Sequence, residues 1–331
     1  MGGKKIMPQL TIVEAVNNAM DLEMQRDKNV VVLGEDVGLD GGVFRATQGL
    51  LKKFGEQRVI DTPLSESGIV GVSIGMAANG LKPIAEIQFS GFVWPAFDQL
   101  SSHAARLRNR TRGQITCPIV VRMPSFGGIK APEHHSESVE ALLAQTPGLK
   151  VVIPSTPFDA KGLLIAAIRD PDPVMFLEPI KIYRAIREEV PQEPYMIPLG
   201  KAKIVKEGKD VTIISYGAMM RQAISAAQIA GQKGIDAEVI DLRSIVPLDV
   251  DTINGSVKKT GRCIVVHEGP RTCGVGAEIS ALINENDLLE LHAPVERVTG
   301  FDTIMPLAKM EHYYLPNDSR IMHAIEKVMN F

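Results

Sequence analysis

Cysteine is scarce in this 331-residue sequence, and long apolar runs are missing. The three cysteines, Cys117, Cys263 and Cys273, form no C-x-x-C pair, which argues against a disulfide framework or a zinc site and fits a reducing compartment. No segment approaches the roughly 18 consecutive apolar residues of a membrane span, so we expect no membrane partner. The N-terminal segment MGGKKIMPQL lacks the apolar core of a signal peptide, and we expect a cytoplasmic protein.

A surplus of positive charge is also missing. The formal net charge is -3, which argues against a nucleic-acid-binding surface. The hydrophobic content of 45% and the charged content of 23% are those of an ordinary globular protein, and the length is sufficient for two domains.

Strand and helix patterns alternate along the chain. Short apolar segments between turn-forming residues predict strands. These segments cover residues 30–33, 115–122, 150–154, 174–177, 210–216, 237–242 and 262–267. Helices are expected between them, one with Thr156 as N-cap and Pro157 at its first position, another over 218–233 and ended by Gly234. Such alternation is typical of a mostly parallel sheet covered by helices.

The alternation breaks at residues 188–198, EEVPQEPYMIP, where prolines and glutamates indicate an extended linker. We therefore predict an α/β fold with two doubly wound domains. The first domain covers residues 1–190 and the linker covers 191–200. The second, smaller domain covers 201–331.

Residues 61–89, DTPLSESGIVGVSIGMAANGLKPIAEIQF, are the most informative segment. They predict a strand end, a loop interrupted by Pro63, a helix of small residues and a second strand. Glycines and alanines leave one side of this helix nearly bare, so a flat ligand or another backbone can approach closely. Ligands of such strand–loop–helix units bind at the carboxyl end of the strand, and Glu66 lies there.

Glu66 has two readings from the residues alone. A glutamate in the first turn often only complements the helix dipole, with Ser65 as the N-cap. Alternatively, Leu64, Ile69, Val70 and Val72 place the carboxyl among apolar groups that favour its neutral form, while the dipole favours the charged form. A carboxyl between these two influences can share a proton with a bound base.

The same segment carries a resemblance. The pattern T-P-L-x-E-x-G-I-V-G begins at Thr62, and A-E-I-Q-F and P-A-F-D-Q follow at 85–89 and 95–99. Further motifs match in order: GEDV at 34–37, GVFR at 42–45, HS at 135–136, PGLKVV at 147–152, AKG at 160–162 and EVIDLR at 238–243. Together they resemble the beta subunit of a thiamine-diphosphate-dependent 2-oxo acid dehydrogenase, most closely the branched-chain type.

The resemblance covers almost the whole chain and implies a pyrimidine-binding domain followed by a transketolase C-terminal-like domain. It implies that Glu66 is the carboxyl that activates the thiamine diphosphate. Leu64 and Phe92 match residues that line or stack on the aminopyrimidine, and Phe89 lies beside Phe92 in QFSGFVWPAF. Branched-chain members carry a tyrosine at the position of Phe92, and a phenyl ring still stacks. An ordinary aromatic core is the alternative for both phenylalanines.

A glycine-containing loop, PSFGGIKAPEHHSES, carries His134 and His135. Adjacent loop histidines are usually solvated, and no third metal ligand is evident nearby. The resemblance implies that His135 faces the substrate, where an imidazole can donate a proton or hold a lipoyl group. His134 has no such counterpart. The loop suggests a mobile wall of the active site.

The diphosphate half of the cofactor site is missing from the sequence. The family binds magnesium and diphosphate with a G-D-G segment, and no G-D-G occurs in this chain. We therefore expect no magnesium site here and a separate alpha subunit that holds magnesium, in an α2β2 heterotetramer. The family also binds potassium in some members, which would place an ion near Ile119, Asp170 and Asp172.

The sequence therefore predicts the beta subunit of a branched-chain 2-oxo acid dehydrogenase. The expected reaction is oxidative decarboxylation of a small 2-oxo acid with acyl transfer to lipoyl groups of a dihydrolipoyl acyltransferase core. A pyruvate or acetoin dehydrogenase beta subunit is the first alternative. A non-catalytic assembly module is the alternative of another class, and retention of Glu66 and His135 argues against it.

Overall fold

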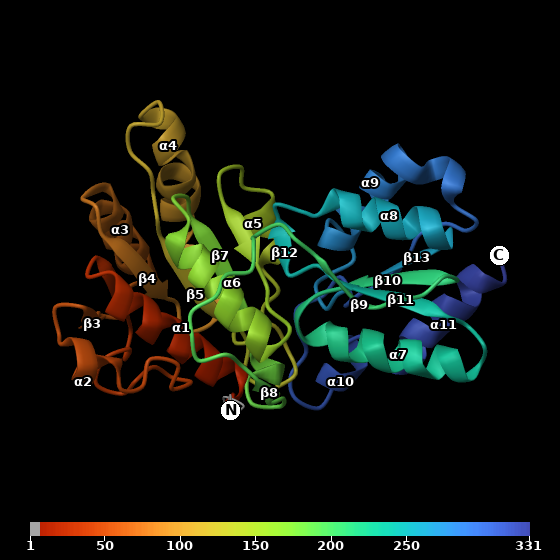
Figure 1. Cartoon of the computed structure of the whole chain (residues 1–331), viewed down its shortest axis with the longest axis horizontal. Coiled ribbons are helices and arrows are strands. Elements are labelled where there is room, and N and C mark those ends of the chain that lie inside the picture. Colours follow the sequence, from red (N-terminus) through yellow and green to blue (C-terminus); the bar gives the residue numbers. More distant parts are fainter. Residues whose placement is uncertain (1–6) are drawn as a thin grey trace, which may run out of the picture.

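The computed structural model describes residues 7–331 as two lobes, each built on a largely parallel sheet (Figure 1). The expectation that MGGKKIMPQL is not a signal peptide concerns residues that lie mostly outside this range. Within residues 7–331, no helix is long and apolar enough to cross a membrane.

The first sheet lies in the N-terminal lobe. Its strands are β2 (Val30–Gly34), β3 (Val59–Asp61), β4 (Lys82–Glu86), β5 (Val120–Ser125), β6 (Lys150–Val152), β7 (Val174–Pro179) and β12 (Ser244–Val246). Their order is β12-β6-β7-β5-β4-β2-β3, and every pairing is parallel except that of β12 with β6. A separate antiparallel pair joins β1 (Gln9–Leu10) to β8 (Glu188–Glu189).

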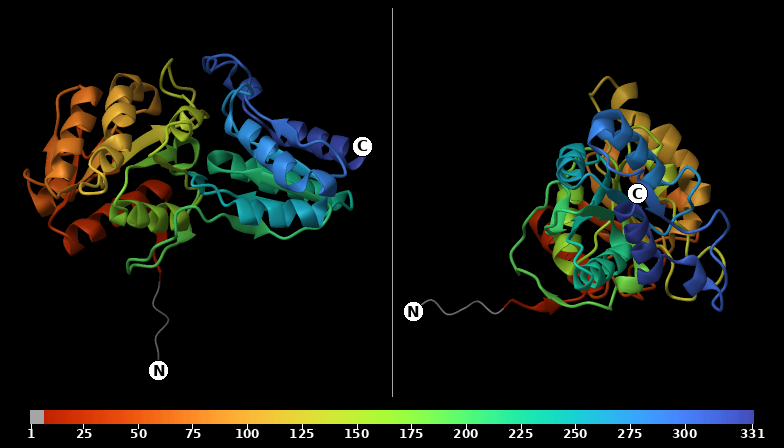
Figure 2. Two further views of the ribbon diagram at one scale, coloured as in Figure 1. Left: turned by 90° about the horizontal axis from the view of Figure 1, so that it is seen from above. Right: turned by 90° about the vertical axis from the view of Figure 1, so that its right-hand side faces the viewer.

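Helices cover both faces of this sheet (Figure 2). On one face α1 (Ile12–Arg26) packs on α6 (Pro157–Arg169), and on the other α3 (Glu66–Ala78) packs on the helical turns η1 (Ser90–Ala96) and η2 (Gln99–His103). The remaining elements of this lobe are α2 (Leu50–Phe54), η3 (Ala104–Arg106), α4 (Leu107–Arg110), α5 (Glu140–Ala144) and η4 (Ile180–Ile182).

The second sheet lies in the C-terminal lobe. Its strands are β9 (Lys203–Lys206), β10 (Val211–Ser215), β11 (Ala237–Asp241), β13 (Cys263–Val266) and β14 (Glu296–Val298), in the order β14-β13-β10-β11-β9. Only β9 runs antiparallel to its neighbour. Two pairs of packed helices cover this sheet: α7 (Met220–Gln232) packs with α11 (Asp318–Met329), and α8 (Val250–Thr260) packs with α9 (Val275–Asp287). The short elements are η5 (Gly217–Met219), η6 (Leu288–Glu290) and α10 (Glu311–Tyr314).

Local sequence signals explain where the helices begin. Thr11 and Glu14 form a reciprocal capping box at the start of α1. Thr156 accepts a hydrogen bond from the Asp159 amide, and Pro157 begins α6, as the sequence predicts. Ser65 occupies the N-cap position of α3, but its side chain makes no capping hydrogen bond.

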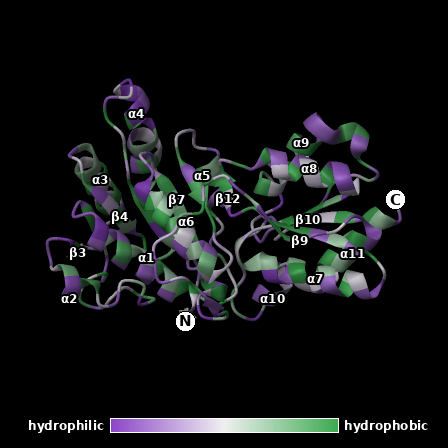
Figure 3. Cartoon of the chain, viewed as in Figure 1, coloured by the Kyte–Doolittle hydropathy of each residue, from purple (hydrophilic) through white to green (hydrophobic). Residues whose placement is uncertain are grey.

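The apolar core follows the strands through both lobes (Figure 3). One buried cluster contains residues of α1 and α6 together with residues of α7 and α11. The other contains residues of α3 and α5 together with residues of α8 and α9. Each apolar layer therefore continues from one sheet to the other, which fixes the two carboxyl edges relative to each other.

The α/β prediction with mostly parallel sheets is confirmed, whereas several strand limits differ. Strand β5 begins at Val120 rather than at residue 115, because Pro118 has no amide hydrogen to donate and Cys117 donates instead to the Pro171 carbonyl. Strand β4 ends at Glu86, short of the expected Phe89. The domain limits 1–190, 191–200 and 201–331 stay a prediction.

Candidate active site

The carboxyl ends of four adjacent parallel strands bring the candidate residues to one edge of the first sheet. Gly34, Asp61 and Glu86 lie side by side at the ends of β2, β3 and β4, and β5 runs beside β4. Glu35 follows the first of these strands, Glu66 follows the second, and the loops after β4 and β5 carry the aromatic residues and His135. Parallel α/β sheets bind ligands at this edge.

Glu66 is the first residue of α3 and is partly exposed. Within residues 7–331 its carboxylate accepts no hydrogen bond and forms no ion pair, so it is available to a ligand. The loop beside it is fixed by Asp61, which accepts hydrogen bonds from the amides of Gly38 (2.5 Å) and Leu39 (3.0 Å). These contacts tie the loop after β2 to the end of β3.

The apolar surroundings expected for Glu66 are only partly present, and that interpretation is wrong for two residues. Ile69 and Val70 are buried against the sheet, as helical spacing requires. Leu64 and Val72, however, are 80% and 54% exposed, because Leu64 lies in the loop and Val72 lies on the outer side of the helix. Leu64 therefore offers an unoccupied apolar surface beside Glu66, which fits contact with a flat ring.

Glu35 is a residue of this edge to which the sequence analysis gave no role. It is only 7% exposed, and burial raises the pKa of its carboxyl, with the negative charges of Glu66 and Asp36 adding to the rise. The GEDV motif marked its position but not its neighbours, because only the sheet brings the ends of β2 and β3 together. Its carboxyl is a second acid within electrostatic range of Glu66.

An aromatic cluster continues the edge. The rings of Phe89 and Phe92 meet edge to face at 5.6 Å, and His135 lies 4.4 Å from Phe89 and 5.1 Å from Phe92 between ring centroids. Phe44 packs against Phe89 at 5.4 Å. The structure thus joins three residues that the sequence analysis selected separately.

His135 has one ring nitrogen engaged and one free. Its Nδ1 lies 2.8 Å from the Glu133 carbonyl oxygen, and since a carbonyl only accepts, Nδ1 carries the hydrogen. Nε2 is therefore the nitrogen available for proton transfer. His134 is exposed, and its ring makes no hydrogen bond within the described residues, which agrees with the absence of a role for it.

Comparison with known proteins assigns the chain to a family. The model of the transketolase pyrimidine-binding domain matches residues 8–185, and that of the transketolase C-terminal domain matches residues 200–321. The chain is 54% identical over 322 residues to the pyruvate dehydrogenase E1 component subunit beta of Acholeplasma laidlawii, covering 97% of this chain and 98% of that protein. The chain belongs to the E1 beta-subunit family of the 2-oxo acid dehydrogenases.

Two further comparisons agree with this membership. The subunit of the same name from Bacillus subtilis is 52% identical over 325 residues, covering 98% of this chain and 100% of that protein. A solved structure described as a split gene transketolase, inactive beta4 tetramer, has a TM-score of 0.80 at 22% identity over 98% of this chain and 99% of that chain. It supports the fold alone. These E1 beta relatives carry the pyruvate name, so the branched-chain type expected from the sequence is not supported and its pyruvate alternative fits better.

Glu86, the carboxylate at the end of β4, has a structural role in this E1 beta-family chain. It is 3% exposed and forms an ion pair of 2.6 Å with Arg122, which is fully buried. Arg122 also holds Glu178 at 2.6 Å, and the Tyr183 hydroxyl donates to Glu178. This buried group cross-links β4, β5 and β7 beneath the site edge.

The residues suggested for potassium do not favour a cation. The Asp170 carboxylate is held by the Lys150 ammonium at 2.6 Å, and Asp172 is held by Arg108 at 2.6 Å. The Ile119 carbonyl accepts from the Val174 amide at 3.0 Å. Positive side chains already occupy these carboxylates, and among residues 7–331 no group of three or more His, Cys, Asp or Glu side chains forms a metal-binding cluster. The potassium site near Ile119, Asp170 and Asp172 stays a prediction.

Gly274 is the N-cap residue of α9, and Gly276 lies in the first turn of that helix. The Gly276 amide donates to Nε2 of His267 at 3.2 Å, so a side chain of this chain fills the N-terminus of α9. Burial lowers the pKa of His267 to about 4, which keeps the ring neutral and able to accept. His267 and Glu268 are both buried in the chain, which excludes them from a docking surface on it.

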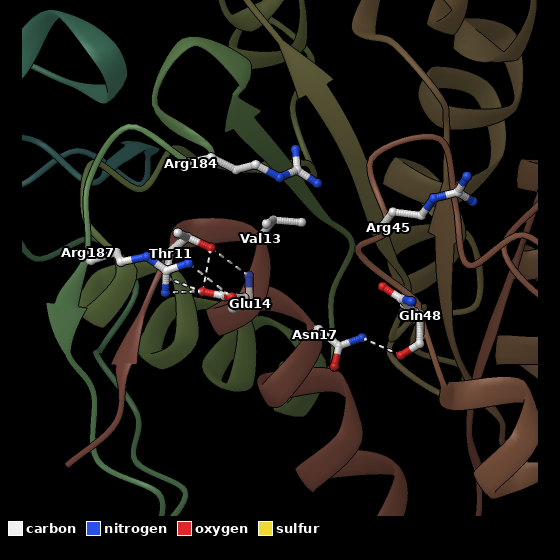
Figure 4. Close-up of a pocket in the computed structure, with 8 residues that line it drawn as sticks. All are labelled: Thr11, Val13, Glu14, Asn17, Arg45, Gln48, Arg184 and Arg187. Atoms are coloured by element: carbon white, nitrogen blue, oxygen red, sulfur yellow. Dashed lines mark hydrogen bonds and ion pairs between the residues drawn. The ribbon is translucent and has the colours of Figure 1, made fainter. Parts of the chain in front are cut away.

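A basic surface pocket of about 490 Å³ lies between the start of α1 and the loop after β2 (Figure 4). Arg45, Arg184 and Arg187 line it. Arg187 pairs with Glu14 at 3.1 Å, and Arg45 and Arg184 donate to main-chain carbonyls. Its positive charge is thus partly engaged within the chain, and it carries no candidate function.

Proposed function

We propose that this chain is the beta subunit of the decarboxylating component of a pyruvate dehydrogenase complex. In this proposal the enzyme uses thiamine diphosphate that is bound between this chain and an alpha subunit. The acyl group left after decarboxylation passes to a lipoyl group of a dihydrolipoyl acyltransferase. The names of the relatives from Acholeplasma laidlawii and Bacillus subtilis support the substrate. The observation that carries the proposal is the edge itself. A carboxylate without a partner among residues 7–331, an exposed leucine and a phenylalanine–histidine cluster follow adjacent parallel strands there.

The residues of the edge fit a bound cofactor that carries an aminopyrimidine ring and a thiazolium ring. When bound, thiamine diphosphate supplies the carbon nucleophile and the electron sink for decarboxylation. In this proposal Glu66 holds a proton at a ring nitrogen of the aminopyrimidine. Leu64 and Phe92 contact the faces of that ring, and Phe89 supports Phe92 from behind. Glu35 adds a second carboxyl near Glu66, and burial together with the charges of Glu66 and Asp36 raises its pKa.

His135 serves the step that follows decarboxylation in this proposal. Its Nδ1–H is held by the Glu133 carbonyl, so Nε2 is presented to the site. A neutral imidazole with a free Nε2 can accept a proton at that nitrogen, and the imidazolium formed in this way can return the proton to a dithiolane sulfur. Packing against Phe89 and Phe92 fixes the plane of the ring.

The diphosphate and its magnesium are assigned to the alpha subunit. The chain has no G-D-G segment. Magnesium requires oxygen ligands in near-octahedral geometry, and the diphosphate contributes several of them. We propose an α2β2 heterotetramer in which neither subunit alone completes the site.

A branched-chain dehydrogenase is the second candidate. The motifs A-E-I-Q-F at 85–89 and P-A-F-D-Q at 95–99 favour it. Substrate pockets of this family draw on both subunits, so these motifs weigh less than the identity of whole relatives.

A substrate panel tests both candidates. The chain is purified with its alpha subunit, and decarboxylation of pyruvate is compared with that of the 2-oxo acids of valine, leucine and isoleucine. We expect the highest kcat/KM for pyruvate. A preference for branched acids would transfer the proposal to the second candidate, and the absence of thiamine-diphosphate-dependent turnover with every acid would contradict both.

A further inference from the structure

The loop over residues 126–135, which carries His135, adopts an unfavourable backbone conformation. Phe126, Lys130 and His134 all have positive φ, at 75°, 58° and 67°. A non-glycine residue with positive φ costs roughly 1–3 kcal/mol of backbone strain, and such a conformation persists only where the surroundings impose it. Contacts outside the loop must therefore hold it in place.

Part of this support comes from the N-terminal lobe. At the base of the loop the Phe126 amide donates to the Glu137 carbonyl at 3.1 Å, and the Ser90 hydroxyl donates to the same oxygen at 2.9 Å. A Cβ added to Gly91 would lie 2.1 Å from the His134 carbonyl oxygen, so the loop rests on bare backbone there. These contacts hold the ends of the loop but leave its first glycines unsupported.

Two carboxylates of the C-terminal lobe hold those glycines. Glu268, which follows β13, accepts a hydrogen bond from the Gly127 amide at 2.8 Å. Glu311, the first residue of α10, accepts one from the Gly128 amide. Both glutamates are 3% exposed, so each bond lies in a water-poor environment where its loss is costly.

The glycines fit this contact because they have no side chain. A Cβ at Gly127 would lie 2.6 Å from the Met305 methyl group and 3.3 Å from Oε1 of Glu311. Gly128 has φ +99° and is closed from the other side by the Lys181 stem, 2.4 Å from the position of a Cβ. The loop therefore fits tightly between the C-terminal lobe and the N-terminal lobe.

We propose that Glu268 and Glu311 are positioning residues for His135: they hold the Gly127 and Gly128 amides and so set the conformation of the loop that presents the imidazole. Neither glutamate contacts the candidate site. The part of this inference that concerns acyl transfer rests on the proposed function, whereas the part that concerns the loop does not.

Amide hydrogen exchange in the full chain, alone and assembled with its alpha subunit, tests the loop directly. Glu268→Leu removes the acceptor, whereas Glu268→Gln keeps an amide oxygen in the same place. We expect Glu268→Leu to accelerate exchange at Gly127 and Gly128 by about tenfold or more, and Glu268→Gln to stay near wild type. Cleavage by trypsin after the exposed Lys130 should follow the same order.

Glu238→Leu is the matched control. Glu238 is a buried carboxylate of the same lobe that accepts from the Gly208 amide at 3.3 Å and lies on β11, away from the loop. Its loss should lower the stability of the lobe without changing exchange at Gly127 and Gly128. Equal acceleration by Glu238→Leu and Glu268→Leu would overturn the proposal, and so would unchanged exchange in Glu268→Leu. If Glu268→Leu does not fold, Glu311→Ala in the short helix α10 gives the same comparison at Gly128.

Separate half-reactions provide the functional readout. We expect Glu268→Leu to slow acylation of a free lipoyl domain more than decarboxylation with an artificial electron acceptor, and Glu268→Gln to restore it. Faster loop exchange with normal lipoyl acylation would overturn the positioning role. Failure of the proposed function gives a different pattern. The wild-type enzyme would then catalyse neither half-reaction, whereas Glu268→Leu would still accelerate amide exchange at Gly127 and Gly128.

Discussion

Two carboxyl edges of parallel sheets lie in this chain, and they are used in opposite ways. The edge of the first sheet is open: Leu64 is 80% exposed, and the Glu66 carboxylate has no partner within the described residues. The edge of the second sheet is closed: His267 is 0% and Glu268 3% exposed, and Glu268 binds an amide of the first lobe. In the two proposals above, the same architecture provides a ligand site in one lobe and a support for it in the other.

The buried charges differ in the same way. Under the open edge, Arg122 lies between Glu86 and Glu178, and the ion pairs are short. At the closed edge, the negative charges of Glu140 and Glu311 add to the rise in the pKa of the buried Glu268 carboxyl, whereas Lys181 and the Gly127 amide oppose it. Burial raises the pKa of Glu140 to about 7 and that of Glu268 to about 8. Under the open edge a buried arginine pairs with both carboxylates, whereas at the closed edge burial raises the pKa values of carboxyls that have no such ion pair.

The largest effect is expected at the open edge. Glu66→Ala should leave the fold intact, because the Glu66 carboxylate makes no hydrogen bond or ion pair with residues 7–331. It should slow proton exchange at the thiazolium carbon by roughly 10²–10⁴-fold. Exchange is measured by deuterium incorporation in the assembled enzyme. The control is Glu56→Gln, because Glu56 is an exposed glutamate that precedes β3. Wild-type exchange in Glu66→Ala would remove the catalytic assignment.

Removal of Arg122 should break the support beneath that edge. Arg122→Met leaves Glu86 and Glu178 buried without their cation, which typically costs about 3–5 kcal/mol of unfolding free energy. Urea denaturation measures it. Arg108→Met is the control, because the Arg108–Asp172 pair is exposed and should contribute less than about 1 kcal/mol. Equal losses in the two variants would mean that the buried network is not the support described here.

His135→Ala tests the loop that joins the two edges. We expect acylation of a free lipoyl domain to fall by roughly 10²-fold, at least as much as decarboxylation, since Nε2 is the group available for proton transfer. The two half-reactions are assayed separately. His134→Ala, one residue away and exposed, should behave as wild type. Normal lipoyl acylation in His135→Ala would reduce this histidine to a packing role against Phe89 and Phe92.

The smallest effect is a pH dependence of stability from the closed edge. The pKa values of Glu140 and Glu268 are raised on folding, so the folded chain keeps protons that the unfolded chain releases above about pH 4.5. Stability should therefore fall as pH rises toward 7 for Glu140 and toward 8 for Glu268. The slope should be at most about 1.4 kcal/mol per pH unit for each group.

Urea denaturation at a series of pH values between about 5.5 and about 8.5 measures this slope. Glu268→Gln should flatten it, whereas Glu290→Gln on the surface should not. Neighbouring groups modulate it: Glu140 and Glu311 raise the pKa of Glu268, and Lys181 and the Gly127 amide lower it. An identical slope in Glu268→Gln and wild type would show that Glu268 holds no proton near neutral pH.

The sequence predicted what local patterns determine. Thr156 and Pro157 mark the start of α6, and the spacing of apolar residues identifies most strands of both sheets. Glu66 and His135 were found through motifs, and their positions at one edge follow from parallel order alone.

What the sequence did not predict depends on contacts between distant segments. The closeness of Glu35 to Glu66 needs the β2–β3 pairing, and the role of Glu268 needs the packing of the lobes. The exposure of Leu64 and Val72 depends on which side of α3 faces the sheet. The choice between pyruvate and branched substrates could not be made from short motifs, because in the proposed enzyme the substrate pocket is divided between two subunits.

Strand β12 has a consequence for how the chain can be divided. It comes after β11 in sequence, yet it pairs antiparallel with β6 at the end of the first sheet. A protein truncated near residue 200 would expose the main-chain donors and acceptors of β6 along an unprotected edge, and such edges recruit strands from other molecules. The two lobes are therefore interlocked, and the N-terminal lobe without the C-terminal one is expected to aggregate.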